Sequence, residues 1–292
     1  MMQPPWFLLI LLSSIWGTSF LLISVSLASL TPSEVVLTRL VTGTLLLLIV
    51  LKVRRLSLPN LRRDIVAWRT YGILALIGNV LPFYLIAWGQ QYVGSGTAGM
   101  LMAVMPLTTL LLAHILLPDE RLTTLRLAGV LLGASGIWVL LNPEQTGHPK
   151  ELLAALAILS AALLYSLNAV LAKRLPSSAP LPTALGVLLC ASLMTLPLVL
   201  LEPQPSPSSL SLTSGLAALW LGLGGTGFAT LLYFKIVEQA GATFLANINY
   251  LIPVIAFFCG VAVLDEPMTP RSFLALALVL SGITLSRTRR AR

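Results

Sequence analysis

The sequence has little of what a soluble enzyme requires. Only 10% of its 292 residues are charged, whereas soluble domains carry about 25%. Its two cysteines, Cys190 and Cys259, both lie in apolar runs, so we expect neither a structural disulfide nor a metal site. Its two histidines, His114 and His148, offer little for acid–base catalysis. With 57% hydrophobic residues and a mean hydropathy of +0.93, the composition indicates an integral membrane protein.

Motifs that carry catalysis are also missing. The chain contains no HExxH, no GxSxG, no P-loop and no aspartate-rich diphosphate motif, each of which would place a known reactive group. The sequence therefore predicts no catalytic residue, no metal ligand and no cofactor, and argues against an enzyme.

Long apolar runs are what the sequence has instead. A helix needs about 20 apolar residues to cross a bilayer core of roughly 30 Å, whereas a barrel would show segments of about 10 alternating residues. The first run lacks the basic start and cleavage site of a signal peptide, so we interpret it as a retained span. We thus predict an all-α membrane protein with ten transmembrane helices. The expected spans are 6–26, 33–53, 71–92, 94–117, 123–141, 152–171, 181–201, 216–237, 242–263 and 270–286.

The net charge of +8 is interpreted as a topological signal. If the N-terminus is cytoplasmic, all of the 18 Lys and Arg residues except Arg39, Lys150 and Arg271 fall on the cytoplasmic side. Excess Lys and Arg in cytoplasmic loops is the main determinant of orientation. We therefore expect both termini in the cytoplasm, a multi-pass protein of the cell inner membrane, and no nucleic-acid partner.

An internal repeat organises the chain. Gly94 stands twelve residues before Pro106, and Gly241 stands twelve residues before Pro253. An Asp-Glu pair closes each run, at 119–120 and at 265–266. A repeat of five spans must enter the membrane upside down the second time, as in many secondary transporters. The sequence predicts two five-helix inverted repeats, at residues 1–143 and 150–292, around a central cavity.

Several fragments in this order resemble a known family. They are IWGTSF at 15–20, TRL around Arg39, the two glycine-to-proline runs, and the endings DERLT and DEPMT. Together they resemble an EamA-type member of the drug/metabolite transporter superfamily. The resemblance implies a ten-helix exporter of small metabolites whose cavity is lined by helices 1 to 4 and 6 to 9. Amino-acid exporters are a frequent assignment among such families.

Polar and aromatic side chains inside the spans are the candidate substrate-binding residues. Burying polar groups in hydrocarbon is costly unless they face a cavity or a partner. Amide and hydroxyl groups can hold a polar head, and aromatic rings can stack on an apolar side chain. The alternative is that they only bond helix to helix. The candidates are Trp16, Thr18, Ser19, Asn79, Tyr84, Trp88, Tyr165, Asn168, Tyr233, Asn247, Asn249 and Tyr250.

Two prolines and one arginine have two readings each. Pro106 and Pro253 free the carbonyls of Met102 and Asn249, so each is either a hinge for alternating access or a static bend. Arg39 is either an anchor for a carboxylate, which a guanidinium binds bidentately, or a snorkelling and packing residue.

The run Gly129 to Gly133 has GxxxG spacing and marks either a dimer face or packing within the chain.

Acidic residues are absent from the middle of every expected span. All ten lie in loops or at span ends, whereas proton-coupled transporters usually carry one within the membrane. We therefore expect facilitated movement down a gradient. The pairs Asp119-Glu120 and Asp265-Glu266 are interpreted as anions at the starts of the spans that follow them, or else as part of a gate.

The sequence predicts a transporter that exports small neutral metabolites, with amino acids including aromatic ones as the leading class, by alternating access. Its expected partners are a small-molecule substrate and the lipid bilayer, and its oligomeric state stays open, with a monomer possible. The rivals are a multidrug or nucleotide-sugar carrier, a membrane-embedded lipid enzyme, and a channel. A nucleotide-sugar site needs several basic groups, and the spans offer only Arg39 and Lys235.

Overall fold

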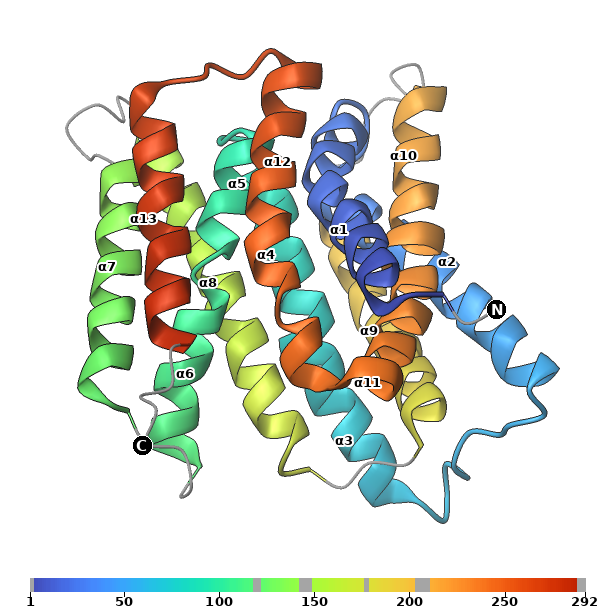
Figure 1. Ribbon diagram of the computed structural model, residues 1–292. Coiled ribbons are helices and arrows are strands. Elements are labelled where there is room, and N and C mark those ends of the chain that lie inside the picture. Colours follow the sequence, from blue (N-terminus) through green and yellow to red (C-terminus); the bar gives the residue numbers. More distant parts are fainter. Residues whose placement is uncertain (1–2, 118–121, 142–148, 176–178, 203–210, 288–292) are drawn as a thin grey trace.

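The computed structural model describes residues 3–117, 122–141, 149–175, 179–202 and 211–287. Every regular element in these ranges is a helix (Figure 1). Two of the elements, η1 and η3, are π-helical turns. In chain order the elements are α1 (Pro5–Leu27), α2 (Pro32–Val53), α3 (Ile65–Ala75), η1 (Leu76–Val80), α4 (Leu81–Gly89), α5 (Ser95–Met102), α6 (Met105–Leu116), α7 (Thr124–Leu141), α8 (Pro149–Ala172), α9 (Pro180–Leu201), α10 (Leu212–Gly222), η3 (Leu223–Phe228), α11 (Ala229–Leu245), α12 (Ile248–Leu264) and α13 (Pro270–Arg287).

Length and composition make this helical bundle a multi-span membrane protein. Among the described residues, eight helical segments are long and apolar enough to cross a bilayer, and α12 is a shorter apolar helix. Three of the eight segments consist of more than one helical element. They are α3–η1–α4, α5–α6 and α10–η3–α11. Backbone groups in lipid must be satisfied within the segment, which a helix achieves.

Helix starts follow simple local rules. Proline is the first residue of α1, α2 and α9, a position where its missing N–H leaves no bond unmade. The start of α2 is also a capping box, in which the Thr31 hydroxyl accepts from Glu34 N at 3.3 Å and the Glu34 carboxylate accepts from Thr31 N at 2.8 Å. Both terminal donors are thereby satisfied.

Two expected spans are broken where the sequence suggested continuous helices. The span 94–117 consists of α5 and α6 with a turn at 103–104 between them. The other broken span is 242–263, in which a turn at 246–247 separates the end of α11 from α12. Gly241, just before this span, has φ 81°, a value that glycine adopts without steric cost.

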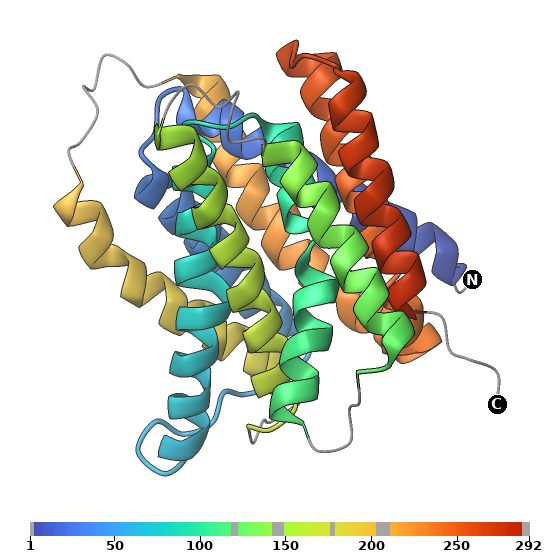
Figure 2. The same ribbon diagram turned by 90° about the vertical axis from the view of Figure 1, so that its left-hand side faces the viewer.

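Helices α7 and α13 form a pair at one side of the bundle (Figures 1 and 2). Glycine permits their close approach, since a Cβ at Gly129 would lie 2.6 Å from the Gly282 carbonyl oxygen. Gly133 faces Leu107 of α6 in the same way. The GxxxG run therefore packs within the chain, as one of its two readings predicted.

Helices α5 and α12 pack antiparallel. Gly99 faces Ala256, Gly96 faces Phe257 and Gly94 faces Glu266, so residue numbers rise along one helix as they fall along the other. The Glu266 carboxylate accepts hydrogen bonds from Ser95 N at 2.5 Å and Gly96 N at 3.0 Å.

The interpretation of Asp265-Glu266 as anions at the start of 270–286 is therefore wrong for Glu266. Asp265 ends α12 in the left-handed conformation, with φ 53°, and this turns the chain so that Glu266 meets the N-terminus of α5. An anion at that end of a helix is favoured by the helix dipole, so the physical principle holds for a different helix. The pair Asp119-Glu120 lies outside the described residues.

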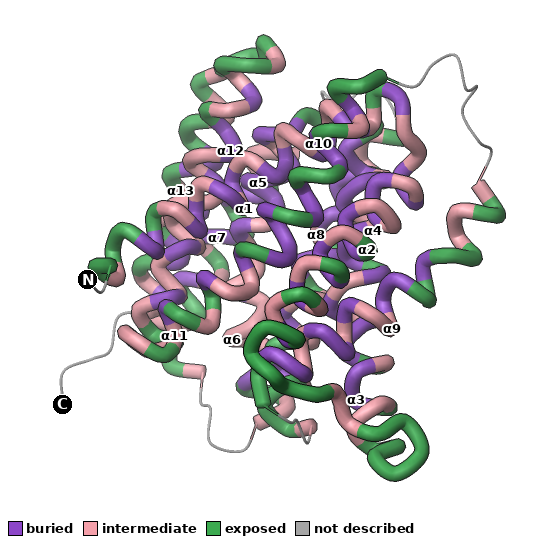
Figure 3. Tube along the Cα trace, turned by 90° about the vertical axis from the view of Figure 1, so that its right-hand side faces the viewer, coloured by how far each residue is buried: buried purple, intermediate pink, exposed green. Residues whose placement is uncertain are grey.

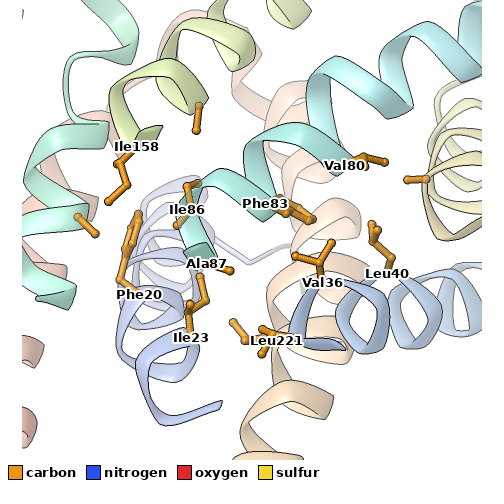
Figure 4. Packing of buried hydrophobic residues seen from close by; sticks show 14 of the residues in the cluster. Phe20, Ile23, Val36, Leu40, Val80, Phe83, Ile86, Ala87, Ile158 and Leu221 are labelled. Atoms are coloured by element: carbon orange, nitrogen blue, oxygen red, sulfur yellow. The ribbon is translucent and has the colours of Figure 1, made fainter. Parts of the chain in front are cut away.

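The main apolar core lies where α1, α2, α4, α8 and α9 meet. Figure 4 shows Phe20 and Ile23 of α1, Phe83 and Ile86 of α4, and Leu40 of α2 in this core. Burial is deepest along these inner helix faces, whereas the segment 54–64 before α3 is mostly exposed (Figure 3).

Candidate functional site

A cavity of about 310 Å³ lies among the inner helices of the bundle. Sites for small ligands commonly occupy about 300–1,000 Å³ and combine apolar walls with a few polar groups. Both repeats expected from the sequence contribute to its wall, through α1, α2, η1, α4, α5, α6, α8, α9, η3, α11 and α12. The lining residues are Trp16, Ser19, Phe20, Ile23, Arg39, Gly78, Asn79, Phe83, Ile86, Met102, Ala103, Met105, Tyr165, Leu188, Gly225, Thr226, Thr230, Ile248, Asn249, Ile252 and Pro253.

Arg39 is the one charged residue among the described residues that line this cavity. It is 9% exposed, its Nε donates to Thr226 Oγ1 at 2.9 Å, and its guanidinium carbon lies 3.9 Å from the centre of the Phe83 ring. Within the described part of the chain, Arg39 has no acidic partner, and its two terminal nitrogens donate to no protein acceptor. A buried cation is costly unless it is paired, so the site can hold an anionic group.

The two π-helical turns both reach the cavity. Gly78 and Asn79 of η1 line it, as do Gly225 and Thr226 of η3. The second pair stands 147 residues after the first, the same separation as between Gly94 and Gly241. Single π-helical turns inside α-helices occur frequently at functional sites. Each half of the chain thus contributes one such turn to the lining of the same cavity.

Trp16 lies against the second of these turns. Its indole Nε1 donates to the Gly225 carbonyl oxygen at 3.0 Å, and its ring centre lies 6.4 Å from that of Tyr233. Ser19, one turn further along α1, borders the same glycine, because a Cβ at Gly225 would lie 3.2 Å from the Ser19 hydroxyl. The aromatic ring and the turn therefore form one wall of the site.

The structure brings seven of the sequence-predicted residues together in the cavity wall. Of the two proline candidates, Pro253 is among them, inside α12. Asn249 donates its side-chain amide to the Ala246 carbonyl at 3.0 Å, which leaves the amide oxygen to accept a hydrogen bond from a ligand. The seven are Trp16, Ser19, Arg39, Asn79, Tyr165, Asn249 and Pro253.

Tyr84 lies outside the cavity lining and holds a different contact. Its hydroxyl donates to Glu202 at 2.7 Å, and the other oxygen of this carboxylate accepts from the Ser33 hydroxyl at 2.6 Å and from Ser33 N at 3.1 Å. Partial burial raises the pKa of the Glu202 carboxyl, but the hydrogen bonds from Ser33, Tyr84 and Thr31 outweigh it, so that the net pKa lies below its usual value. Glu202 thus joins the end of α9 to α2 and α4.

Asn247 and Tyr250 also lie outside the lining, beside the end of α13. Arg287 donates to Asn247 Oδ1 at 3.1 Å, and its guanidinium carbon lies 5.4 Å from the centre of the Tyr250 ring. These contacts connect α12 to α13.

Four further candidates lie outside the lining. Trp88 contacts Tyr92 with ring centres 5.4 Å apart and ring planes tilted by 58°, and Tyr233, 37% exposed, lies next to Trp16. Asn168 is packed against Gly78, and its buried Oδ1 accepts no hydrogen bond within the described part of the chain. Thr18 bonds to the Ser14 carbonyl of its own helix at 2.7 Å.

The two prolines occupy different local structures. Pro106 lies in the first turn of α6, immediately after the turn at 103–104, so the expected kink at this point is a full break between two helices. Pro253 lies inside a continuous α12. Their hinge role stays a prediction.

Sequence reasoning missed Thr226, Thr230 and Phe83 in the lining. Threonine and phenylalanine are common in apolar spans and give no signal alone. The internal repeat did contain a signal for Thr226. This residue stands 147 residues after Asn79, which the sequence analysis had selected as a candidate.

Metal-binding groups do not gather at this site. No cluster of three or more His, Cys, Asp or Glu side chains occurs among the described residues.

Comparisons with known proteins identify the family of this chain. The sequence profile of the EamA-like transporter family matches residues 4–142 and again residues 152–288. The chain belongs to the EamA-like transporter family. Protein PagO of Salmonella typhimurium is 26% identical over 286 residues, which cover 96% of this chain and 91% of that protein. An uncharacterized inner membrane transporter, YedA of Escherichia coli K12, is 24% identical over 273 residues, covering 93% of this chain and 86% of YedA.

The fold is also similar to that of a solved protein. A crystal structure that is 23% identical in sequence superposes with a TM-score of 0.68 and covers 96% of this chain and 95% of that one. Membership of the EamA-like transporter family makes this chain a membrane transporter, and the solved structure shows that its fold has a known relative.

Proposed function

We propose that this transporter exports small neutral metabolites, with amino acids including aromatic ones as the leading class, across the cell inner membrane. The observation that carries the proposal is Arg39, a buried guanidinium that faces the cavity without an acidic partner in the described chain. A zwitterion has no net charge and yet supplies the carboxylate that this group binds best.

The rest of the cavity fits the other parts of an amino acid. The amide oxygen of Asn249 is available to accept from an ammonium group. Trp16, Phe20, Phe83 and Tyr165 supply aromatic walls, on which an aromatic or aliphatic side chain can pack.

A nucleotide-sugar carrier fits less well. Two phosphates call for several cations, and Arg39 is the only cation among the described lining residues. Lys235, the second cation that the spans offered, lies at a different groove beside α1 and is exposed.

The proposed topology has ten spans in two inverted repeats, residues 1–143 and 150–292, with both termini in the cytoplasm. It is supported by the two matches of the family profile, by the π-helical turns 147 residues apart, and by the antiparallel packing of α5 and α12. Trp6 near the chain start packs on Phe244 with ring centres 4.7 Å apart, and Arg287 near the chain end donates to the neighbouring Thr243 carbonyl at 3.1 Å. The start of α1 and the end of α13 therefore lie at one end of the bundle.

Transport by alternating access is the mechanism we propose for this fold. Inverted repeats around a central site are the construction by which many carriers expose one site to each side in turn. Both halves of the chain contain segments that are not α-helical. The first half has η1 and the turn 103–104, and the second half has η3 and the turn 246–247. Such segments absorb the backbone changes that a rocking motion needs.

Efflux from proteoliposomes tests the function. Vesicles loaded with labelled phenylalanine should lose it at a saturable rate through the wild-type protein, and Trp16→Ala should reduce that rate at least tenfold, because it removes both an aromatic wall and the bond to η3. Trp138→Ala is the matched control, since Trp138 on α7 is 68% exposed and outside the cavity lining. Equal rates in the two variants would refute the site, and no saturable efflux of any amino acid would refute the function.

A further inference from the structure

The hydrogen bond between Arg39 and Thr226 joins the charged group of the cavity to the π-helical turn η3. Thr226 Oγ1 accepts from Arg39 Nε at 2.9 Å and donates to the Leu221 carbonyl at 3.2 Å. The acceptor lies five residues before the donor, in the last turn of α10, so this side chain bonds across the junction of α10 and η3. Thr226 therefore connects Arg39 to the backbone of α10 and η3.

The same turn is held from its other side. Trp16 donates to the Gly225 carbonyl at 3.0 Å, and Thr230 donates to the Thr226 carbonyl at 2.7 Å. Gly225 also leaves room for the guanidinium, since a Cβ there would lie 4.0 Å from Arg39 Nη2. Arg39 and Trp16 are thus both oriented by adjacent residues of one turn.

The geometry leaves the ligand-binding edge of the guanidinium open. The Nε of Arg39 donates to Thr226 Oγ1, and its guanidinium carbon lies 3.9 Å from the centre of the Phe83 ring, which covers the planar face. The two terminal nitrogens have no acceptor within the described chain. A guanidinium held at Nε and stacked on a ring has few remaining orientations, so less entropy is lost when it binds a carboxylate.

The twin turn lacks this arrangement. Asn79 of η1 occupies the place of Thr226 in the repeat. Helix α9, which starts at Pro180 as α2 starts at Pro32, contributes Leu188 to the lining where α2 contributes Arg39. Among the described lining residues the charge of the cavity therefore comes from Arg39 alone, which lies between Thr226 of η3 and Phe83 of α4.

We propose that Thr226 is a positioning residue for substrate recognition, which acts by fixing Arg39 so that the substrate carboxylate binds to the guanidinium beside Thr226 of η3. This inference rests on the proposed function, because it names the part of the substrate that Arg39 binds. It adds that the substrate lies in one orientation, with its side chain directed away from η3.

Transport kinetics test the positioning role. In counterflow of labelled phenylalanine, Thr226→Val should raise KM about three- to tenfold, the loss expected for one hydrogen bond, and leave the maximal rate unchanged, because only substrate binding is weakened. Thr226→Ser keeps the hydroxyl and should restore KM. Thr195→Val is the matched control, since Thr195 is fully buried in α9 and bonds only to the Ala191 carbonyl of its own helix. An unchanged KM in Thr226→Val, or a Ser variant as weak as the Val variant, would overturn the proposal.

Hydrogen exchange gives a readout that does not depend on the substrate. Backbone amides of residues 221–230 should exchange faster in Thr226→Val and in Arg39→Leu than in the wild type, whereas Thr195→Val should not change them. Unchanged exchange in both variants would refute the link between Arg39 and η3 whatever the substrate is. Faster exchange in a protein that neither binds nor moves any amino acid would instead refute the proposed function and leave the link in place.

Discussion

Arg39 and Asn249 illustrate, at the scale of the residue, what a polar side chain in an apolar run can reveal. Each is costly to bury, so the sequence selected both as candidates, and both line the cavity. Asn247 carried the same signal but accepts from Arg287 instead. Residues two apart on a helix do not face the same way, and the sequence cannot tell which of them points inward.

Glu202 is a residue whose role in the structure could not be predicted from the sequence. It sits at the end of an apolar run before a proline-rich segment, where an acidic residue is ordinary. The hydrogen bonds that it accepts from Ser33 and Tyr84 come from residues more than 100 positions away, and only the folded chain brings these together.

The lowered pKa of Glu202 predicts a contribution to stability that depends on pH. Since the folded-state pKa lies below the unfolded value, the contribution is complete above about pH 4.3 and is lost as the pH falls through the folded pKa. Glu202→Gln should therefore lower the thermal stability of the purified protein at pH 7, by about 1 kcal/mol for a partly exposed charged acceptor. The difference between wild type and variant should shrink on acidification below about pH 4.3.

Thermal denaturation between about pH 3.5 and pH 7 measures this difference, and Glu238→Gln serves as the control. Glu238 is exposed on α11, and its carboxylate accepts no hydrogen bond within the described chain. A constant difference between wild type and Glu202→Gln across that range would contradict the account.

Apolar segments that are built from two or three helical elements are the main finding at the scale of the element. Hydropathy predicted the apolar runs, and eight segments match the composition of membrane spans. It could not predict the turns η1 and η3, because a π-helical turn depends on contacts made by α2 and α9 across the bundle. The break between α5 and α6 was placed near the right proline but expected as a kink.

Packing between α5 and α12 depends on the absence of a side chain at Gly99. A Cβ there would lie 2.3 Å from the Ala256 Cβ, and overpacking of this kind costs about 1–3 kcal/mol. We predict that Gly99→Ala lowers the denaturation temperature of the purified protein and that adding Ala256→Gly restores part of it.

Gly215 in α10 is the matched control for this prediction. Nothing lies within 4 Å of a Cβ built there, so Gly215→Ala should be neutral or stabilise by roughly 0.5–1 kcal/mol through helix propensity. Equal destabilisation by the two single substitutions would show that Gly99 has no special packing role.

Duplication followed by divergence describes the whole molecule. The chain supplies related elements twice, which is why the repeat could be recognised from glycine, proline and acidic residues alone. The hydrogen bond at the charged group of the cavity joins the two halves, because Arg39 belongs to the first half and Thr226 to the second. Under the proposed function, the charged contact to the substrate therefore comes from Arg39 of the first half, and the second half supplies no charged residue to the described lining.

Cysteine labelling tests the proposed orientation. In a background without Cys190 and Cys259, Ser57→Cys should react with a membrane-impermeant maleimide only after the cells are permeabilised, because the basic segment 54–64 is predicted to be cytoplasmic. Ser211→Cys should react in intact spheroplasts, because it precedes α10 at the opposite end of the bundle. The reverse pattern would invert the topology.

The central claim is that Arg39 binds the carboxylate of an exported amino acid, and counterflow with matched ligands tests it most directly. Unlabelled phenylalanine should drive uptake of labelled phenylalanine into proteoliposomes, whereas phenylalanine amide, which lacks the carboxylate, should not. Arg39→Gln should raise KM by roughly 10- to 100-fold, as expected when a charged hydrogen-bond donor is lost. Arg39→Lys should restore little of the affinity, because an ammonium group cannot bind a carboxylate in the bidentate way. Equal counterflow with the amide, or an Arg39→Gln protein with the wild-type KM, would contradict the account.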